Sequence, residues 1–324
     1  MTLEDVARRY AVAVSPHLLS LMDPADPGDP IARQFLPSLE ELVTLPQELA
    51  DPIGDAAHSP VAGIVHRHPG RALFKAVAAC PVYCRFCFRR ETIGPGHDNG
   101  LSKDEFEAAL SYIAAHPEIR EVILTGGDPF ILSPRRVAEI AGRLAAMAHV
   151  RIVRWHSRVP FTDPERVTDA LVAALHAPGA TTWVAVHANH EREFSSPAQT
   201  AIARLVDGGI ALVSQSVLLK GVNDTAEALA NLMRAFVDNR IKPYYLHHPD
   251  LAPGTSHFRL SIEEGLSLMR QLRERLSGLE MPTYMLDIPG GFGKVPLESA
   301  ALEKTATGYR VRDLSGVWHD YLAG

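Results

Sequence analysis

Every cysteine of the chain lies in one short segment, Cys80-Pro-Val-Tyr-Cys84-Arg-Phe-Cys87-Phe-Arg-Arg90, with the spacing CxxxCxxC. Three thiolates this close together can each bind one iron of a 4Fe-4S cluster. Because the chain has no fourth cysteine, one iron is left for a ligand that is not protein. The spacing therefore predicts a cluster on Cys80, Cys84 and Cys87 with one iron open to chemistry.

The alternatives to a cluster are a structural zinc site, a disulfide and three unrelated buried thiols. A closed zinc site needs four protein ligands, commonly from two separated pairs. An odd number of thiols in one loop does not suit disulfide pairing, and unrelated buried cysteines are scattered along a chain. The spacing and the lack of other cysteines favour the cluster over all three alternatives.

Length and composition are those expected of a cytoplasmic enzyme. The chain has 324 residues, of which 46% are hydrophobic, enough to bury one barrel-sized core with short appendages. Its net charge of -6 argues against a nucleic-acid partner, which needs a basic surface. No apolar run is long enough to span a membrane, and the first residues do not resemble a signal peptide, so we expect no membrane association.

Short apolar runs alternate with amphipathic helices from residue 61 onward, a pattern typical of parallel strands joined by helical crossovers. We predict an α/β fold, a partial (β/α)6 barrel at residues 61–288. A helical appendage precedes it at residues 1–60, ending in a linker at 45–59, and a short C-terminal segment follows at 289–324. The six expected strands are 72–77, 121–124, 151–155, 181–186, 211–215 and 242–246.

Five helix starts are marked by capping signals. Ser102-Lys-Asp-Glu105 and Ser261-Ile-Glu-Glu264 have the capping-box pattern. An N-cap residue before a first-turn proline is predicted at Ser133, Asp163 and Ser196.

The CxxxCxxC spacing resembles that of the radical S-adenosylmethionine (SAM) superfamily. The resemblance implies the same partial barrel, and it implies that the open iron binds SAM, which an electron from the cluster cleaves to a 5'-deoxyadenosyl radical. Ligands of such folds bind at the carboxyl ends of the strands. There, Gly126, Gly127 and Asp128 look like the motif that receives the methionyl amino group of SAM. Four further polar residues follow strands and suit SAM's ribose and carboxylate, although each could also be a structural hydrogen bonder: Ser157, Arg158, His187 and Gln215.

A second glycine-rich motif, Pro289-Gly-Gly-Phe-Gly-Lys294, lies near the C-terminus. A phosphate-binding P-loop would need Gly at position 288 and Ser or Thr at 295, where the chain has Ile288 and Val295. A lysine on a flexible glycine loop is instead well placed to form a Schiff base with an aldehyde cofactor.

With this motif the chain resembles the lysine 2,3-aminomutase family, radical SAM isomerases that also use pyridoxal 5'-phosphate (PLP). The resemblance covers nearly the whole chain and implies that Lys294 is the lysine that binds PLP. It implies that Arg67 and Arg71 hold the PLP phosphate, a role that suits a planar guanidinium. It assigns Arg89 to the α-carboxylate of the substrate.

Two carboxylates bear on the substrate. By resemblance, Asp250 and Asp287 grip the distal ammonium of lysine, and negative partners would repel a glutamate side chain. The expected reaction converts L-lysine to β-lysine in the cytoplasm, with a reductant such as flavodoxin or ferredoxin, and the protein is a possible homo-oligomer. A different amino acid substrate, a role in modifying elongation factor P, and an iron-sulfur binding or sensor protein remain as alternatives.

Overall fold

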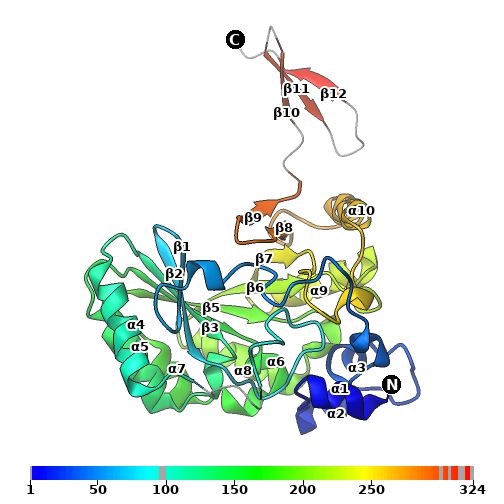
Figure 1. The fold of residues 1–324 in the computed structure, drawn as a ribbon. Coiled ribbons are helices and arrows are strands. Elements are labelled where there is room, and N and C mark those ends of the chain that lie inside the picture. Colours follow the sequence, from blue (N-terminus) through cyan, green and yellow to red (C-terminus); the bar gives the residue numbers. More distant parts are fainter. Residues whose placement is uncertain (1, 95–99, 299–301, 306–307, 313–317, 322–324) are drawn as a thin grey trace.

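Parallel strands form the centre of the molecule (Figure 1). The computed structural model describes residues 2–94, 100–298, 302–305, 308–312 and 318–321. Within these ranges, one nine-stranded sheet follows the sequence order from β1 to β9 and curls into a nearly closed barrel. The strands β2 to β8 are parallel, and the two edge strands, β1 and β9, are antiparallel to their neighbours. The strands are β1 (Ile64–His68), β2 (Arg71–Val77), β3 (Glu121–Gly126), β4 (Ile152–Ser157), β5 (Thr181–His187), β6 (Ala211–Val217), β7 (Lys242–His247), β8 (Thr283–Ile288) and β9 (Gly293–Pro296).

All six predicted strands are confirmed, as β2 to β7, and the α/β barrel is confirmed with them. The prediction missed β1, β8 and β9. Three of the five residues of β1 are His66, Arg67 and His68, so this strand has no apolar run, and β9 is four residues long and contains Gly293 and Pro296. These strands form because they pair with β2 and β8, a long-range effect that local pattern does not report.

Strand β4 has one apolar face and one polar face. In β4, Val153 and Trp155 are fully buried in the main core with the surrounding helices, while Arg154 and His156 alternate with them. Because side chains alternate across a strand, the residues between the core positions face into the barrel. On β4 the face toward the interior is therefore polar, which suits a binding site.

Helices cover the outside of the barrel (Figure 1). The capping boxes predicted at Ser102 and Ser261 are confirmed, as is the N-cap at Ser133. The longer helices are α4 (Lys103–Ala115), α5 (Pro134–Ala145), α7 (Asp169–Leu175), α8 (Ser196–Asp207), α9 (Ala226–Asp238) and α10 (Ile262–Arg273), and a short helix α6 (Val159–Thr162) follows β4.

Of the other two predicted caps, one is shifted by one residue and one has no side-chain hydrogen bond. Ser196 is the first residue of α8, and the cap is Ser195, whose hydroxyl accepts from the backbone of Ala198. The proline therefore occupies the second helical position, which it tolerates as well as the first because neither position needs its N–H. Asp163 is the N-cap residue of a short 3-10 helix (Pro164–Arg166) with proline in its first turn, as predicted. Its carboxylate makes no capping hydrogen bond and pairs with Arg166 instead.

The N-terminal segment packs beside the segment from Cys80 to Arg90, the cysteine loop. It contains α1 (Leu3–Arg9), α2 (Pro16–Leu21), α3 (Pro30–Phe35) and 3-10 turns at Leu39–Leu42 and Ala56–His58. Leu18, Ile31 and Phe35 form a small core with Val82 of the cysteine loop. The appendage thus positions the loop that carries the three thiols.

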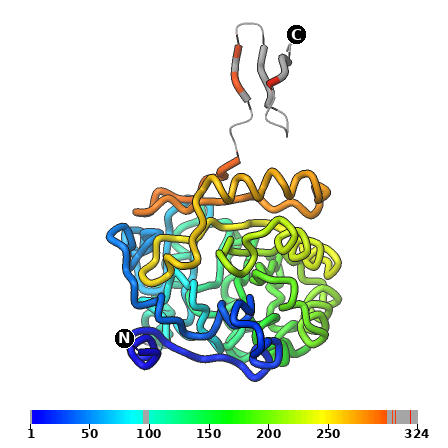
Figure 2. Tube along the Cα trace, turned by 90° about the vertical axis from the view of Figure 1, so that its right-hand side faces the viewer, coloured from blue at the N-terminus to red at the C-terminus, as the bar shows by residue number. Residues whose placement is uncertain are grey.

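A second, three-stranded antiparallel sheet stands away from the barrel in both views (Figures 1 and 2). It consists of β10 (Leu302–Thr305), β11 (Gly308–Arg312) and β12 (Trp318–Tyr321). The domain boundaries at residues 60 and 288 stay predictions, and part of the range 289–324 lies outside the described residues. Among the helices of the described ranges, none combines the length and apolar character that crossing a membrane requires.

Candidate active site

The cysteine loop is fixed by a buried ion-pair cluster. Arg85 lies between the cysteines and donates from Nε to both carboxylate oxygens of Glu41 at 3.0 Å. Arg90 pairs with the same carboxylate, and its guanidinium lies 3.5 Å from the ring centre of Tyr10. Glu41 is fully buried, and its charge is compensated by the two arginines and by the backbone N–H of Ser38, which donates to Oε1 at 2.8 Å. The loop is therefore held by residues of the N-terminal segment on its outer side.

The three thiols are free, and their charges act on one another. Burial raises the pKa of Cys87 to about 11, and the charge of the neighbouring Cys84 adds to the rise. Burial also raises the pKa of Cys80, with further contributions from Cys87 and Cys84. Three neighbouring thiols on one partly buried loop match the donor set of an iron-sulfur cluster, in which each thiolate binds a different iron.

The Gly126-Gly127-Asp128 motif packs backbone to backbone against the start of the cysteine loop. Gly127 donates to Val77 O at 2.7 Å, and Asp128 donates to Ala79 O at 3.0 Å. A Cβ on Gly127 would collide with Ala79, the residue before the first cysteine, and Gly126 has a φ of +108°. Only glycine fits both positions, so the motif sets how closely the cysteine loop approaches β3.

Asp128 links the carboxyl ends of β3 and β4 through hydrogen bonds. Its carboxylate accepts from Ser157 Oγ at 2.8 Å and from the backbone N–H of Arg158 at 2.7 Å, Val159 at 3.2 Å and Phe130 at 3.0 Å. Burial raises its pKa, and these bonds oppose the rise. The side chains of Asp128 and Ser157 therefore satisfy each other, and their predicted contact with SAM stays a prediction.

Histidines line the interior where the central strands end. His156 and His187 meet edge to face with ring centres 5.4 Å apart, and His187 is paired in register with Gln215 of β6. Burial lowers the pKa of His187 to about 3 and that of His156 well below its usual value, so both rings are neutral. Within the described part of the chain, the buried Nε2 atoms of both have no hydrogen-bond partner. Such atoms are available to a bound molecule.

The glycine-rich segment Pro289-Gly-Gly-Phe-Gly-Lys294, the lysine loop, places Lys294 beside Asp287. The two residues lie opposite each other in the antiparallel pair of β8 and β9, and Lys294 Nζ donates to Asp287 Oδ2. His247 Nδ1 lies 3.7 Å from the same oxygen. Burial alone would raise the pKa of Asp287, but His247 and Lys294 together lower it to about 2. Its other oxygen, Oδ1, is buried without a hydrogen-bond partner among the described residues.

Asp250 lies close enough to Asp287 to feel its charge. Burial raises the pKa of Asp250 to about 7, the charge of Asp287 raises it further, and Lys294 and Arg89 oppose the rise. Two carboxylates that repel each other in a buried site form a strong attraction for a cation. The predicted pair is thus brought together, beside the lysine loop.

The two arginines predicted to hold a phosphate flank the turn between β1 and β2. Burial lowers the pKa of His68, and the positive charges of Arg71, Arg67 and Lys294 lower it further. A Cβ on Gly293 would lie 3.5 Å from the same histidine. The three cations therefore gather around His68, where the edge strand β1 faces the lysine loop.

Sequence reasoning missed Asp55, which joins two of the predicted site residues. One carboxylate oxygen lies 3.2 Å from Arg89 Nη2 and the other 3.5 Å from Arg67 Nη2. The residues around it were predicted to be a linker. Instead they pack on the lysine loop, because Gly54 touches Gly291 and His58 Nε2 lies 3.2 Å from Gly291 O.

Comparisons with known proteins agree with this geometry. The Radical SAM superfamily model matches residues 76–233. The chain is 38% identical to L-lysine 2,3-aminomutase of Clostridium subterminale over 88% of its own length and 68% of that protein. It is 37% identical to the L-lysine 2,3-aminomutases of Acetoanaerobium sticklandii and Escherichia coli, covering 69% and 84% of them. The chain belongs to the lysine 2,3-aminomutase family of radical SAM enzymes.

Membership makes the protein an isomerase with a 4Fe-4S cluster, SAM and PLP as cofactors, and the described residues fit each group. The three thiols fit the cluster. The glycine turn at Gly126 and Gly127, beside the cysteine loop, and the unpartnered Nε2 of His187 fit SAM. Lys294 and the cations around His68 fit an aldehyde that carries a phosphate.

Arg89 connects the two parts of this aminomutase site, the cysteine loop and the aspartates beside the lysine loop. Arg89 follows Cys87 by two positions, and its backbone N–H and charge lower the pKa of that thiol. Its charge also lowers the pKa of Asp250. A substrate held by Arg89 would therefore lie between the cysteine loop and the lysine loop.

Proposed function

We propose that the protein converts L-lysine to β-lysine by moving the α-amino group to C3. The observation that carries this proposal is the carboxylate pair Asp250 and Asp287, which lies near the Arg89 guanidinium in the same buried region. A diamino acid has one carboxylate for the arginine and a distal ammonium for the two aspartates. An acidic amino acid would place a negative charge on the aspartates, and that arrangement is repulsive.

The cofactors supply the parts of the reaction that no side chain performs. When bound, the cluster and SAM supply a carbon radical that takes hydrogen from C3, and PLP holds the migrating nitrogen; a side-chain base cannot remove an unactivated C–H proton at neutral pH.

The residues of the chain bind and orient the substrate. Arg89 binds the α-carboxylate, and Asp287 offers its unpartnered Oδ1 to the distal ammonium. Asp250 shares that ammonium, and binding a cation favours its ionised form. The neutral rings of His156 and His187 line the space between without competing for protons. Because these two rings are uncharged, they do not compete with Arg89 and the two aspartates for the charged groups of the substrate.

Lys294 has two proposed roles, which are to bind PLP and to pair with Asp287. Its ammonium is held by Asp287, the same carboxylate that is proposed to receive the substrate's ammonium. Lys294 would release PLP to the substrate's α-amino group, so both ammonium groups would be present once the substrate is bound. Asp287 would then bind Lys294 through Oδ2 and the substrate's distal ammonium through the unpartnered Oδ1.

The proposal extends to partners and compartment. Reduction of the cluster needs an electron donor such as flavodoxin or ferredoxin, and free thiols agree with the reducing cytoplasm. We also propose a homo-oligomer as the working assembly.

The deciding experiment is an amino acid panel with full-length protein reconstituted under nitrogen with iron, sulfide, SAM, PLP and a reductant. We expect isotope-labelled L-lysine to give β-lysine, and glutamate to give no β-amino acid. If labelled lysine stays unchanged while SAM is cleaved with another amino acid, the substrate assignment is wrong. If SAM is not cleaved with any amino acid and no PLP is bound, an iron-sulfur binding protein is the better description.

A further inference from the structure

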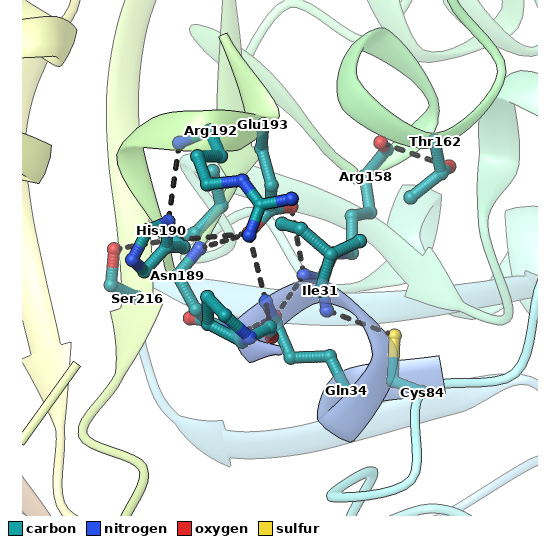
Figure 3. A network of polar contacts seen from close by, with 12 residues as sticks. Ile31, Gln34, Cys84, Arg158, Thr162, Asn189, His190, Arg192, Glu193 and Ser216 are labelled. Atoms are coloured by element: carbon teal, nitrogen blue, oxygen red, sulfur yellow. Dashed lines mark hydrogen bonds and ion pairs between the residues drawn. The ribbon is translucent and has the colours of Figure 1, made fainter. Parts of the chain in front are cut away.

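Arg158 makes a direct contact with one of the cluster-binding cysteines (Figure 3). It follows the last residue of β4, and its Nη1 donates a hydrogen bond to Cys84 Sγ at 3.1 Å. The guanidinium carbon lies 4.6 Å from the ring centre of Phe35 and 5.1 Å from that of Phe86. A positive charge beside a sulfur, enclosed by aromatic rings, acts through a low local dielectric and is weakly screened.

A buried carboxylate balances this charge. Arg158 Nη2 donates to Glu193 Oε2 at 2.9 Å, and Glu193 is fully buried. The other oxygen of Glu193 accepts from the backbone N–H of Asn189 at 2.8 Å and of His190 at 3.0 Å. Every oxygen of the carboxylate therefore has a donor, and Glu193 cannot turn away from Arg158 without losing several bonds.

The N-terminal segment also fixes the position of Arg158. Gln34 of α3 accepts from Arg158 Nη2 and from Asn189 Nδ2, and its own Nε2 donates to Glu193. The backbone oxygen of Gln34 accepts from Arg85 N, in the cysteine loop, at 2.8 Å. Figure 3 shows these groups around Arg158, from α3, from the cysteine loop at Cys84 and from the turn after β5. The guanidinium is thus fixed at Cys84 by three separate parts of the chain.

We infer that Arg158 is a positioning residue that raises the reduction potential of the cluster through Cys84, and that Glu193 limits this rise. Reduction adds one negative charge to the cluster. Hydrogen bonds to the ligating sulfurs and nearby positive charges stabilise that added charge and are established means of tuning iron-sulfur potentials. The inference concerns the cluster only and does not depend on which amino acid is the substrate.

The test is a potentiometric titration of the cluster-reconstituted full chain, followed by electron paramagnetic resonance, without SAM, PLP or substrate. We expect Arg158→Gln to lower the equilibrium constant for reduction about tenfold, a shift of about 59 mV to more negative potential for a one-electron couple. Arg158→Lys keeps the charge and loses the forked geometry, so it should shift the potential less.

The opposite sign is expected for the counter-charge. Glu193→Gln keeps an acceptor oxygen for the backbone N–H groups and removes the negative charge, so the potential should rise. Arg192→Gln is the matched control, because Arg192 belongs to the same region but pairs with Asp29 at 2.7 Å and does not touch a thiol. A merely structural role would make Arg158→Gln and Glu193→Gln lose iron or shift in the same direction.

The outcomes are decisive even when a variant is damaged. An unchanged potential in Arg158→Gln at full iron content overturns the inference. If Arg158→Gln does not hold the cluster, an unchanged or lowered potential in Glu193→Gln overturns it. A shift that arises only after SAM is added would identify Arg158 as a contact to SAM, as predicted from sequence, and would also overturn the redox role. Iron and sulfide content and SAM cleavage report separately on whether the protein is a radical SAM enzyme at all.

Discussion

Lys294 and Asp287 lie opposite each other on two antiparallel strands, and the lysine ammonium is bound to the aspartate carboxylate. This pairing joins two predicted roles that the sequence places seven residues apart. It is a consequence of the β8–β9 hairpin, whose turn is made by Gly290 and Gly291, both with positive φ. The lysine is thereby anchored at the carboxylate pair even though its loop is exposed at Phe292.

Lys294 should be the residue that captures PLP. We expect borohydride treatment of the PLP-loaded protein to fix one pyridoxyl group on the peptide that contains Lys294, as detected by mass spectrometry. Lys294→Ala should lose this label, because Lys294 is the lysine whose charge acts on His68 together with Arg67 and Arg71, the two arginines proposed to hold the phosphate. Lys220→Ala, at an exposed position, is the control and should be labelled like the wild type. A label that persists in Lys294→Ala would refute the assignment.

The carboxylate pair should set the affinity for lysine. Asp287→Asn and Asp250→Asn each leave a buried ammonium with one negative partner fewer. Loss of one partner of a buried charge pair costs about 2 kcal/mol or more, which is about a 30-fold fall in kcat/KM. The kinetics should be measured with lysine at saturating SAM, with iron and PLP content checked for each variant. Equal kcat/KM values in wild type and both variants would show that the distal ammonium binds elsewhere.

The raised pKa of Asp250 predicts a pH dependence. Its folded pKa of about 7 means that the carboxyl is largely protonated at pH 6 and largely ionised at pH 8. The lysine side chain stays protonated over this range, and it binds the ionised form of Asp250. KM for lysine should therefore fall about tenfold as the pH rises from about 6 to about 8. In Asp250→Asn the fall should disappear, and a fall of the same size in that variant would assign the titration to another group.

The same shift has a consequence for stability with the opposite sign. An acid whose pKa is raised by folding binds more protons in the folded state, so its contribution to stability is lost as the pH rises from its unfolded pKa through about 7. For the protein without substrate, we expect Asp250→Asn to be more stable than the wild type at pH 8. The two proteins should be closer in stability at about pH 5, where Asp250 is protonated. Urea unfolding at the two pH values measures the difference, and a less stable variant at pH 8 would contradict it.

The local motifs could be predicted from sequence, and the residues that hold them in place could not. CxxxCxxC, Gly126-Gly127-Asp128 and the lysine loop each carry their chemistry within a few neighbouring residues, so their spacing is visible in the chain. Glu193 has no such signal, since its partner Gln34 is 159 residues away. Asp55 looks like part of a polar linker until the fold places it between two arginines. Such residues become recognisable only through packing between distant segments.

Asp55 should stabilise Arg67 and Arg89 in the protein that has no PLP or substrate bound. Asp55→Asn leaves Arg67 and Arg89 close together without a negative charge, at positions where each is less than one-sixth exposed. We expect the free energy of unfolding of the PLP-free protein to fall by about 2 kcal/mol. Because a bound phosphate group restores negative charge, PLP should raise the melting temperature of Asp55→Asn more than that of the wild type. An equal rise in both proteins would show that Asp55 does not share its arginine with PLP.

Glu41 should be the most sensitive residue of the N-terminal segment. It is fully buried and is the shared partner of Arg85 and Arg90, so Glu41→Gln leaves two buried guanidinium groups without a compensating charge. Removing one partner of a buried ion pair costs about 3 kcal/mol or more, whereas an exposed pair is worth about 0.5 kcal/mol. Glu107→Gln is the matched control, because Glu107 pairs with Arg143 at 2.8 Å and both side chains are more than 40% exposed. Urea unfolding should show a large loss of stability for Glu41→Gln and almost none for Glu107→Gln. Since Arg85 lies between the cluster ligands, Glu41→Gln should also bind less than the full complement of iron after reconstitution. A variant that is as stable as the control and holds four irons would show that the N-terminal segment does not hold the cysteine loop in place.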